Sequence, residues 1–564
     1  MGALLLLILA EVLAFYGTTL VRDGINSLNP EIQTRYTVGV YAAIFFGLVL
    51  IQGTMRFISR YLMGFSSRKI EYLVRNDFFD RVMRQEPAFF VEQNVGDLIS
   101  RAINDLNAVR EMLGRTLMFF STSVLRIPVA LLMLLWINWR LTLICLIPFS
   151  WMPFLLKRLS TRVHQYFERI QEYFALMSGR VREAFTGIRV LKAYTRERDE
   201  LEHFGAMNAE FVTLNRRLIR FESLIFPLIM FLPGISMILL LWIGGTAVAR
   251  GSITFGEFTQ FQIVLMMLIF PISSLGFTWS GLQRGATSMG RLKAIMDRQP
   301  RITDPPNLRL PEPEIRGEIR FQHLTFRYRS DLPPVLKDVS LHIPAGMTVA
   351  ITGPTGSGKS TLVSLIPRLY EAEPGMVLVD GRDVREYSLK HLRGAIGFVE
   401  QRPFLFSESI GENLRFGNDR ADEEALREAA RVAHLLPEIE EFPEGFDTEL
   451  GERGLTISGG QRLRTSLARA LVRRPKILIL DDAFAAVDTA TEEAILNDLR
   501  DYLREMTVIL ISHRVSTLRE ADRIVVLIEG QIAEEGTHEE LLAAGGYYAE
   551  LCEKQRLQEE LAAL

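Results

Sequence analysis

Nine consecutive residues decide the fold of the second half of the chain: Gly353-Pro354-Thr355-Gly356-Ser357-Gly358-Lys359-Ser360-Thr361. They follow a short apolar run, Met347–Ile351, and precede a helix-like stretch, Leu362–Tyr370. A glycine-rich turn between a strand and a helix lets several backbone N–H groups point at one anion, and the helix N-terminus adds positive potential. Lys359 would reach the β- and γ-phosphates, and the Ser360 hydroxyl would ligate Mg²⁺. The sequence therefore predicts a site for a nucleoside triphosphate rather than a Gly/Ser surface turn.

Composition divides the chain into two parts. At 564 residues it is too long for one core, and a mean hydropathy of +0.15 coexists with 23% charged residues. Long apolar runs lie before about residue 285, and charged sequence of balanced sign lies after about residue 315. A net charge of -3 gives no electrostatic basis for nucleic-acid binding. Cys145 and Cys552 lie far apart in sequence, so we expect neither a disulfide framework nor a cysteine metal site.

The sequence of the first domain, residues 1–297, predicts six membrane-spanning helices. Windows of about 20 apolar residues match the thickness of the bilayer core. They lie at 2–20, 38–63, 115–137, 141–157, 224–248 and 258–283. Buried helices of a soluble domain are excluded because several runs exceed 18 residues with almost no charge. A signal peptide at the start would need a basic region, which this sequence lacks.

Basic residues predict the orientation of these helices. The two long connections, after the second and fourth spans, carry most of the Lys and Arg residues of this half. By the positive-inside rule they face the cytoplasm, and so does the second half of the chain. The second connection spaces apolar residues by three and four, at Ile170–Phe185 and Leu201–Phe211, so we expect the spans to continue as helical stalks. The predicted location is the cell (plasma) membrane, with multiple passes through the lipid bilayer.

Glu11 lies in the first apolar window and Arg126 in the third, so each places an ionisable group within or near a predicted span. A charge inside a span is costly, usually faces the bundle interior and marks a transport pathway. The alternatives are snorkelling of Arg126 to the cytoplasmic interface and mutual pairing of the two residues. Both residues are therefore candidates for a substrate cavity, in which Glu11 would influence the transport of cationic compounds.

Residues 298–315 predict an extended linker, because prolines alternate with charges without an apolar period. Residues 316–564 then predict an α/β domain. Its strand-like runs are Ile319–Phe326, Met347–Ile351, Ile396–Val399, Ile477–Leu480, Val508–Ile511 and Ile524–Leu527. Helical patterns between several of them favour a mainly parallel sheet, with the phosphate turn at the carboxyl end of a strand.

Carboxylates and an imidazole follow two of these strands. Ile477–Leu480 ends in Asp481 and Asp482, and Asp481 would lie near a Mg²⁺ ion held by Ser360. His513 follows the next strand and could hydrogen-bond a γ-phosphate, although a lone His at a strand end is usually structural.

A second phosphate-binding device occurs in the same domain. Ile457-Ser458-Gly459-Gly460-Gln461 precedes a helical stretch, Arg462–Val472, and forms a backbone nest at a helix N-terminus. One nucleotide cannot use two such devices that lie far apart on one lobe. We therefore expect two such domains to face each other, each completing the other's site.

Together these residues resemble the ATP-binding cassette (ABC) transporters, specifically exporters in which six spans precede one nucleotide-binding domain on a half-transporter chain. The resemblance covers essentially the whole chain. It rests on the phosphate loop Gly353–Thr361, Gln401 of the Q-loop, the segment Thr448–Gly454 ahead of the signature Ile457–Gln461, the Asp481 strand, Asp488 of the D-loop and His513 of the switch. It implies that Tyr328 stacks on adenine and that Ser360, Gln401 and Asp481 ligate Mg²⁺. The catalytic residues would be Asp482, His513 and Gln401.

The resemblance also implies coupling helices at two cytoplasmic loop tips. Phe89-Phe90 followed by Gly96-Asp97-Leu98 is similar to the first cytoplasmic loop of these exporters. The two tips would lie near Phe89–Gly96 and Thr195–Phe204.

One residue departs from the family pattern. The acid after the Mg²⁺-binding Asp is normally Glu, which polarises the attacking water, whereas this chain has Asp482. One methylene less withdraws the carboxylate by roughly 1.5 Å, and a misplacement of about 1 Å can cost on the order of a hundredfold in rate. The resemblance offers an interpretation, because heterodimeric exporters often pair a degenerate site with a competent one. The predicted partner is a second homologous half-transporter chain, which would use the intact signature of this chain.

The resemblance implies ATP-driven export of amphipathic or hydrophobic compounds, such as drugs, lipids or peptides, by alternating access. Two rival interpretations stay open. A regulatory membrane protein that senses ATP without transport would also suit Asp482, and a homodimeric lipid or peptide exporter would carry two slow sites. The sequence does not identify the cargo.

Overall fold

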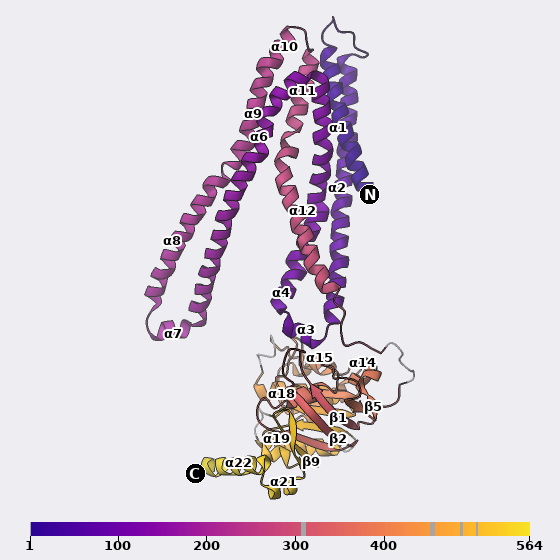
Figure 1. Cartoon of the computed structure of the whole chain (residues 1–564), viewed down its shortest axis with the longest axis vertical. Helices are drawn as coiled ribbons and strands as arrows, with labels where there is room; N and C mark the ends of the chain where they lie inside the picture. Colours follow the sequence, from indigo (N-terminus) through magenta and orange to yellow (C-terminus); the bar gives the residue numbers. More distant parts are fainter. Residues whose placement is uncertain (1, 306–311, 452–456, 485–488, 504–505, 564) are drawn as a thin grey trace. The chain divides into compact units, whose positions relative to one another are not determined.

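The computed structural model describes residues 2–305, 312–451, 457–484, 489–503 and 506–563. The chain forms two compact units (Figure 1). Unit 1 comprises Met1–Met83 and Val95–Arg298, and unit 2 comprises Arg84–Asn94 and Gln299–Leu564. Each unit has its own hydrophobic core.

The regular structure described in unit 1 is helical. Its α-helices are α1 (Gly2–Asn26), α2 (Val38–Met83), α4 (Val95–Ser100), α5 (Leu106–Glu111), α6 (Leu117–Thr186), α7 (Ile188–Ala193), α8 (Glu197–Glu222), α9 (Ile225–Leu239), α10 (Gly245–Ala249), α11 (Phe255–Met267) and α12 (Ile269–Met296). Three π-helical segments connect some of them, η1 (Arg101–Asp105), η2 (Met112–Thr116) and η3 (Leu240–Gly244). Five continuous helical stretches of the described residues are long and apolar enough to cross a membrane: Gly2–Asn26, Val38–Met83, Val95–Thr186, Glu197–Ala249 and Phe255–Met296.

The third of these stretches contains the third and fourth predicted spans. Asn138 has φ -161° and ψ 104°, which is extended backbone, so α6 consists of two helices that meet there. The Asn138 side-chain oxygen accepts a hydrogen bond from the backbone N–H of Leu141 at 3.0 Å and so caps the second helix. Two spans thus lie within one long helical stretch, because the connection between them is only a few residues long.

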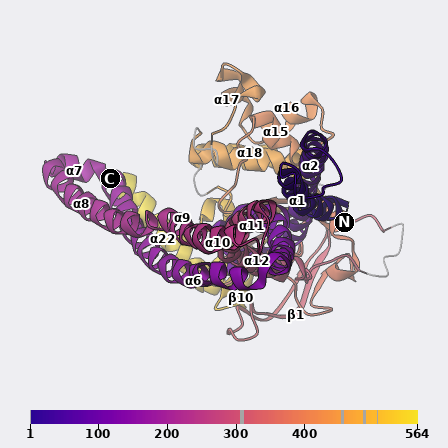
Figure 2. The same ribbon diagram turned by 90° about the horizontal axis from the view of Figure 1, so that it is seen from above.

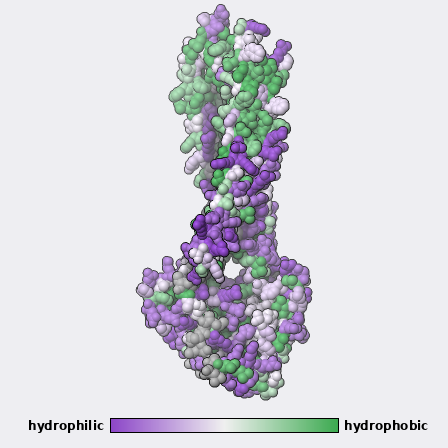
Figure 3. Space-filling view, turned by 90° about the vertical axis from the view of Figure 1, so that its left-hand side faces the viewer, coloured by the Kyte–Doolittle hydropathy of each residue, from purple (hydrophilic) through white to green (hydrophobic). Residues whose placement is uncertain are grey.

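The surface of unit 1 is strongly apolar. Large side chains such as Trp136 and Phe57 are exposed, while a core of smaller and aromatic side chains from α1, α6 and α11 is buried. Figure 3 shows hydrophobic residues gathered over the end of unit 1 that carries α10 and α11. An exposed apolar band of this kind is what a lipid-facing surface requires.

Close helix contacts in unit 1 depend on glycines of α12. A Cβ atom added at Gly285 would overlap the side chain of Met112 in η2, and one added at Gly281 would overlap Thr116. By contrast, Gly290 on the same helix has no atom near its missing Cβ position. Small residues spaced in this way let helix backbones approach closely.

Unit 2 contains two sheets. The larger has the order β10-β9-β3-β8-β7-β6, and the smaller has the order β2-β1-β4-β5. The strands are β1 (Ile319–Phe326), β2 (Leu336–Ile343), β3 (Thr348–Thr352), β4 (Val377–Val379), β5 (Arg382–Asp383), β6 (Ile396–Val399), β7 (Ile477–Asp481), β8 (Thr507–Ile511), β9 (Arg523–Ile528) and β10 (Gln531–Gly536). In the larger sheet the strands from β9 to β6 pair in parallel, as predicted, and β10 adds an antiparallel edge.

The helices of unit 2 surround these sheets. They are α3 (Pro87–Glu92), α13 (Lys359–Ser364), α14 (Leu389–Gly394), α15 (Ile410–Arg415), α16 (Glu423–Val432), α17 (Leu436–Glu441), α18 (Gly459–Val472), α19 (Thr489–Leu503), α20 (Val515–Leu518), α21 (His538–Ala544) and α22 (Tyr547–Ala563), with short 3₁₀ turns η4 (Val384–Glu386) and η5 (Gly445–Asp447). Helices α15 to α18 gather on one side of unit 2, and β1 and β10 lie on the other (Figure 2).

The first predicted loop tip contains a short helix, whereas the second lies just after one. Residues 84–94, which include α3, form part of unit 2, where Phe89 is buried and the Glu86 carboxylate accepts the backbone N–H of Arg301 at 3.2 Å. At the other tip the short helix is α7, which lies a few residues before the predicted segment Thr195–Phe204.

Replacing Gly285 by Ala should lower the stability of unit 1 by about 1–3 kcal/mol, because the added methyl group overlaps Met112. Gly290→Ala on the same helix is the matched control, and it should leave stability unchanged or raise it slightly. Thermal melting of the purified chain in detergent measures both effects. Equal melting temperatures for the two variants would contradict the packing described.

Candidate functional site

The loop between β3 and α13 takes a shape that only glycines fit. Gly353 has φ 138° and Gly358 has φ 99°, both in the region that side chains rarely adopt. A Cβ atom at Gly353 would also overlap the carbonyl oxygen of Leu527 in β9. The loop therefore folds tightly against the neighbouring strand at the carboxyl end of β3.

Lys359 points back into this loop. Its Nζ donates to the carbonyl oxygens of Gly353 at 2.9 Å and Pro354 at 2.8 Å, and its side chain is buried. Burial lowers the pKa of Lys359, while the carboxylates of Asp481 and Asp482 oppose that shift. The ammonium group is thus held at the centre of the loop, where it can be shared with an anion.

Ser360 and Asp481 meet as the sequence predicted. The Ser360 hydroxyl donates to Asp481 Oδ1 at 3.1 Å, which joins the start of α13 to the end of β7. Burial raises the pKa of Asp481 above its ordinary value, and Asp482 adds to the shift, whereas the hydrogen bond from Ser360 and the charge of Lys359 oppose it. A hydroxyl and a carboxylate side by side are hard oxygen donors that fit Mg²⁺, which typically takes one or two carboxylates together with substrate phosphates.

Asp482 lies one residue beyond the strand in an unusual backbone conformation. Its φ is 52°, in the left-handed region, where Asp is several-fold enriched among residues with a side chain. Its backbone N–H donates to the Ile511 carbonyl at 3.0 Å, and its carboxylate accepts from Gln401 Nε2 at 3.3 Å. The structure therefore brings together the predicted Q-loop residue and the predicted catalytic carboxylate.

His513 follows β8, the strand between β3 and β7, and is half-buried. Burial lowers the pKa of His513, and Lys359 lowers it further, while Asp482 opposes the shift. The imidazole is therefore mainly neutral at pH 7, and its electrostatic neighbours are the lysine of the loop and the carboxylate after β7.

Tyr328 lies at the same loop. Its hydroxyl shares a hydrogen bond with Thr361 Oγ1 at 2.8 Å, and its ring meets the edge of Tyr370 at 4.9 Å between centroids. Tyr328 is 42% exposed. Stacking on adenine stays a prediction.

The signature segment forms a helix N-terminus. Ser458 caps α18, because its hydroxyl accepts from the Gln461 N–H at 3.1 Å while the Gln461 side chain accepts from the Ser458 N–H at 2.8 Å. This capping box fixes the backbone of Gly459 and Gly460 in the first turn. Asp488 and residues 452–456 of the preceding segment lie outside the described residues.

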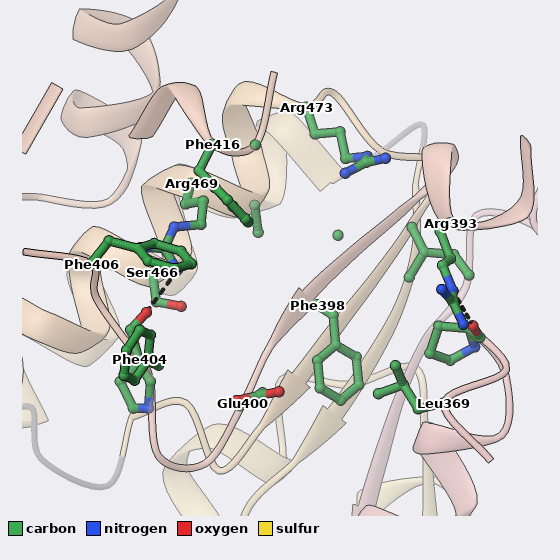
Figure 4. Close-up of a pocket in the computed structure, with 16 residues that line it drawn as sticks. Leu369, Arg393, Phe398, Glu400, Phe404, Phe406, Phe416, Ser466, Arg469 and Arg473 are labelled. Atoms are coloured by element: carbon green, nitrogen blue, oxygen red, sulfur yellow. Dashed lines mark hydrogen bonds between the residues drawn. The ribbon is translucent and has the colours of Figure 1, made fainter. Parts of the chain in front are cut away.

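Sequence reasoning missed a groove between the strand β6 and the helix α18. Its volume is about 370 Å³, and Figure 4 shows its aromatic lining, including Phe398, Phe404 and Phe416, with Glu400 and Arg469. Arg469 donates to the carbonyl oxygens of Phe404 and Asn413, each at 2.8 Å. Burial lowers the pKa of Arg469 to about 10.

Arg469 thus joins α18, which begins at the signature, to the segment that follows Gln401. The sequence offered one signal for this contact: Arg469 lies within an otherwise apolar turn of the predicted helix, Leu467–Leu471.

In unit 1 the structure pairs the two ionisable residues of the spans. The Glu11 carboxylate accepts from Arg126 Nε and, at 3.1 Å, from Arg126 Nη2. A residue that sequence reasoning missed, Arg56 on α2, donates to Glu11 at 3.0 Å. The three side chains carry a net positive charge, and Glu11 is fully enclosed. A role of Glu11 and Arg126 in a substrate cavity stays a prediction.

These observations define a class of protein: a multi-pass membrane protein with a phosphate-loop nucleotide-binding domain on the same chain. Residues 1–272 match the model of the ABC transporter transmembrane region, and residues 336–485 match that of the ABC transporter domain. The chain belongs to the ABC transporter family, and its nucleotide-binding domain is an ATPase coupled to transport.

Similar proteins cover the chain almost end to end. It is 33% identical over 98% of its length, and 95% of the relative, to the "Probable multidrug resistance ABC transporter ATP-binding/permease protein YheI" of Bacillus subtilis. It is 34% identical over 90% of its length, and 84% of the relative, to an ATP-dependent lipid A-core flippase of Syntrophus aciditrophicus. A bacterial Atm1-family ABC exporter with ATP bound has a similar structure, with a TM-score of 0.77 and 25% identity over 98% of this chain and 97% of that one.

The comparisons confirm the predicted fold class, a helical membrane domain followed by an α/β ATP-binding domain. They also confirm the predicted resemblance to exporter half-chains. The number of spans is approximate, because two of the predicted six lie in one long helical stretch.

Replacing Glu11 by Gln should destabilise unit 1 by about 3 kcal/mol, because two guanidinium groups would lose their shared carboxylate in a buried setting. The double variant Glu11→Gln with Arg126→Gln should recover part of that loss. The control is Glu31→Gln, an exposed position after α1. Thermal melting in detergent measures all three, and a double variant less stable than the single one would argue against the pairing.

Proposed function

We propose that this chain is one half of a two-chain exporter and that its own ATP site hydrolyses ATP slowly. The exporter moves amphipathic or hydrophobic compounds out of the cytoplasm or the inner leaflet. Asp482 carries the proposal, because it occupies the position of the family's catalytic Glu with a shorter side chain. The names of the relatives, multidrug resistance protein and lipid A-core flippase, support an apolar or amphipathic cargo.

In this proposal the phosphate loop holds ATP through its backbone N–H groups and Lys359. Residues Gly353 to Thr361 form the cradle, and Tyr328 stacks on the adenine. Ser360, Asp481 and Gln401 hold Mg²⁺, which neutralises charge that develops on the phosphates. The hydrogen bond between Ser360 and Asp481 supports this assignment.

Asp482 is poorly suited to activate the attacking water. Its backbone is fixed by the bond to Ile511, so the side chain cannot advance to replace the missing methylene. A shortfall of roughly 1.5 Å in reach exceeds the misplacement of about 1 Å that costs on the order of a hundredfold in rate. Gln401 also donates a hydrogen bond to the Asp482 carboxylate, and this bond further restricts the position of the carboxylate.

The partner in this proposal is a different, homologous half-transporter. The capping box of Ser458 and Gln461 leaves the signature well formed, so it can complete an ATP site that the partner's phosphate loop provides. ATP would favour the closed pair because the second phosphate nest contacts it only on closure. The packing of α3 within unit 2 supports transmission of that closure through the first cytoplasmic loop.

The chain purified alone should hydrolyse ATP very slowly, and Asp482→Glu should raise hydrolysis in the two-chain complex by at least about tenfold. Asp482→Asn is the matched control, since it keeps the shorter side chain and removes the charge. Phosphate release and native mass measurement test the proposal together. A native mass of two identical chains would contradict the two-chain proposal and favour the homodimeric exporter, and rapid hydrolysis by such a pair would also contradict the slow site.

Lys359→Ala should reduce ATP occupancy of this chain, because the ammonium group that bridges the loop is lost. Filter binding of labelled ATP with Mg²⁺ measures the occupancy, and Lys390→Ala, an exposed position of α14, serves as control. ATP-dependent movement of an amphipathic dye in vesicles distinguishes an exporter from an ATP sensor. Full occupancy in Lys359→Ala would contradict the assigned loop function.

A further inference from the structure

The last helix of the chain contacts the switch segment through one side chain. Gln555 on α22 donates from Nε2 to the carbonyl oxygen of His513 at 2.5 Å, and its Oε1 accepts from the backbone N–H of Val515 at 2.9 Å. One amide therefore bonds the backbone on both sides of Arg514.

The hydrogen bond from Val515 gives a partner to a backbone N–H that has none within its own helix. Val515 is the first residue of α20, which has only four residues, and an N–H in the first turn of a helix has no partner within that helix. The preceding residue, Arg514, provides no side-chain cap. Gln555 thus supplies from α22 the cap that the switch segment itself lacks.

The same segment is also anchored by α19. Glu492 on α19 is buried, and it accepts hydrogen bonds from Arg514 Nη1 and from the Thr517 hydroxyl. The backbone that carries His513 is therefore held between α19, which follows residues 485–488, and α22.

The attachment of α22 to the rest of unit 2 is limited in extent. Tyr548 is fully buried, and Leu551 and Cys552 pack against the same small cluster. The end of α22 projects from unit 2 (Figure 1). Leu557 and Leu561 on this helix are exposed. Gln555 is half-buried at the point where the packed part of α22 ends, so local opening of this helix would release it.

We propose that Gln555 is a positioning residue for His513, so that ATP hydrolysis depends on the docking of α22. The inference rests on the proposed role of His513 in the ATP site. Loss of the two bonds leaves the phosphate loop intact but frees the backbone that aims the imidazole. Hydrolysis should therefore decline while ATP binding stays the same.

The test uses the full-length chain in the complex in which it purifies from membranes. Gln555→Ala should lower about tenfold the slow single-turnover phase of ATP hydrolysis that belongs to this chain's own site, a smaller loss than the roughly hundredfold cost of a misplacement of about 1 Å, and leave the dissociation constant of Mg²⁺-ATP within about twofold. Gln555→Glu keeps an acceptor for Val515 but loses the donor to His513, so its rate should be intermediate. Gln558→Ala, an exposed position on the same helix, is the matched control and should match the unaltered chain.

A structural readout keeps the result independent of the chemistry. Hydrogen exchange of the Val515 amide should become faster in Gln555→Ala but not in Gln558→Ala, because only the former removes its acceptor. Deletion of residues after 554 should reproduce Gln555→Ala, and deletion after 558 should not.

The outcomes separate the two levels of inference. If His513→Ala slows hydrolysis but Gln555→Ala does not, the positioning role is wrong and the proposed function stands. If His513→Ala itself has no effect, the role of His513 in the proposed function fails, and the present inference fails with it. Unchanged Val515 exchange in Gln555→Ala would also overturn the inference.

Discussion

Parallel pairing of four neighbouring strands governs the chemistry of this protein. In the order β3-β8-β7-β6 each strand ends at the same edge of the sheet, so the residues that follow them are collected there. The phosphate loop follows β3, His513 follows β8, Asp482 follows β7 and Gln401 follows β6. In an antiparallel sheet of the same strands, alternate turns would lie at opposite edges. The site is therefore a consequence of topology before any side chain is considered.

Burial of charge sets what this edge can bind. Lys359 and Asp481 are both buried, and burial shifts their pKa values toward the neutral forms, so each charge is maintained by its neighbours. Two carboxylates face one ammonium group, which leaves a negative excess that a divalent cation can neutralise. The cluster in unit 1 has the opposite balance, with one Glu11 carboxylate between two guanidinium groups. The rule that buried charges must be paired operates in both units, with opposite residual sign.

The predictable features of this fold are those with a local signature. The strands β1 and β6 were predicted with their bounds, because apolar residues recur through β1 and fill most of the short strand β6. The strands β2 and β10 were missed, since polar residues alternate along them and each lies at the edge of its sheet. Arg56 was also missed, because its partner Glu11 belongs to another helix and only the packing of α1 against α2 brings them together. The role of Asp488 stays a prediction, as that residue lies outside the described part of the chain.

Side chains that contribute no reacting group fix the turns at the catalytic edge. Arg469 bonds the segment after Gln401 to the signature helix, and Gln555 bonds the segment after β8 to the last helix. Both bonds end on backbone carbonyl oxygens, so they depend on the positions of helices rather than on the identity of the residues they hold. A movement of α18 would therefore displace the segment that follows Gln401, and a movement of α22 would displace the backbone of His513. Gln401 donates a hydrogen bond to Asp482, and the charge of Asp482 influences His513, so the turns that these two helices hold both border on the same carboxylate.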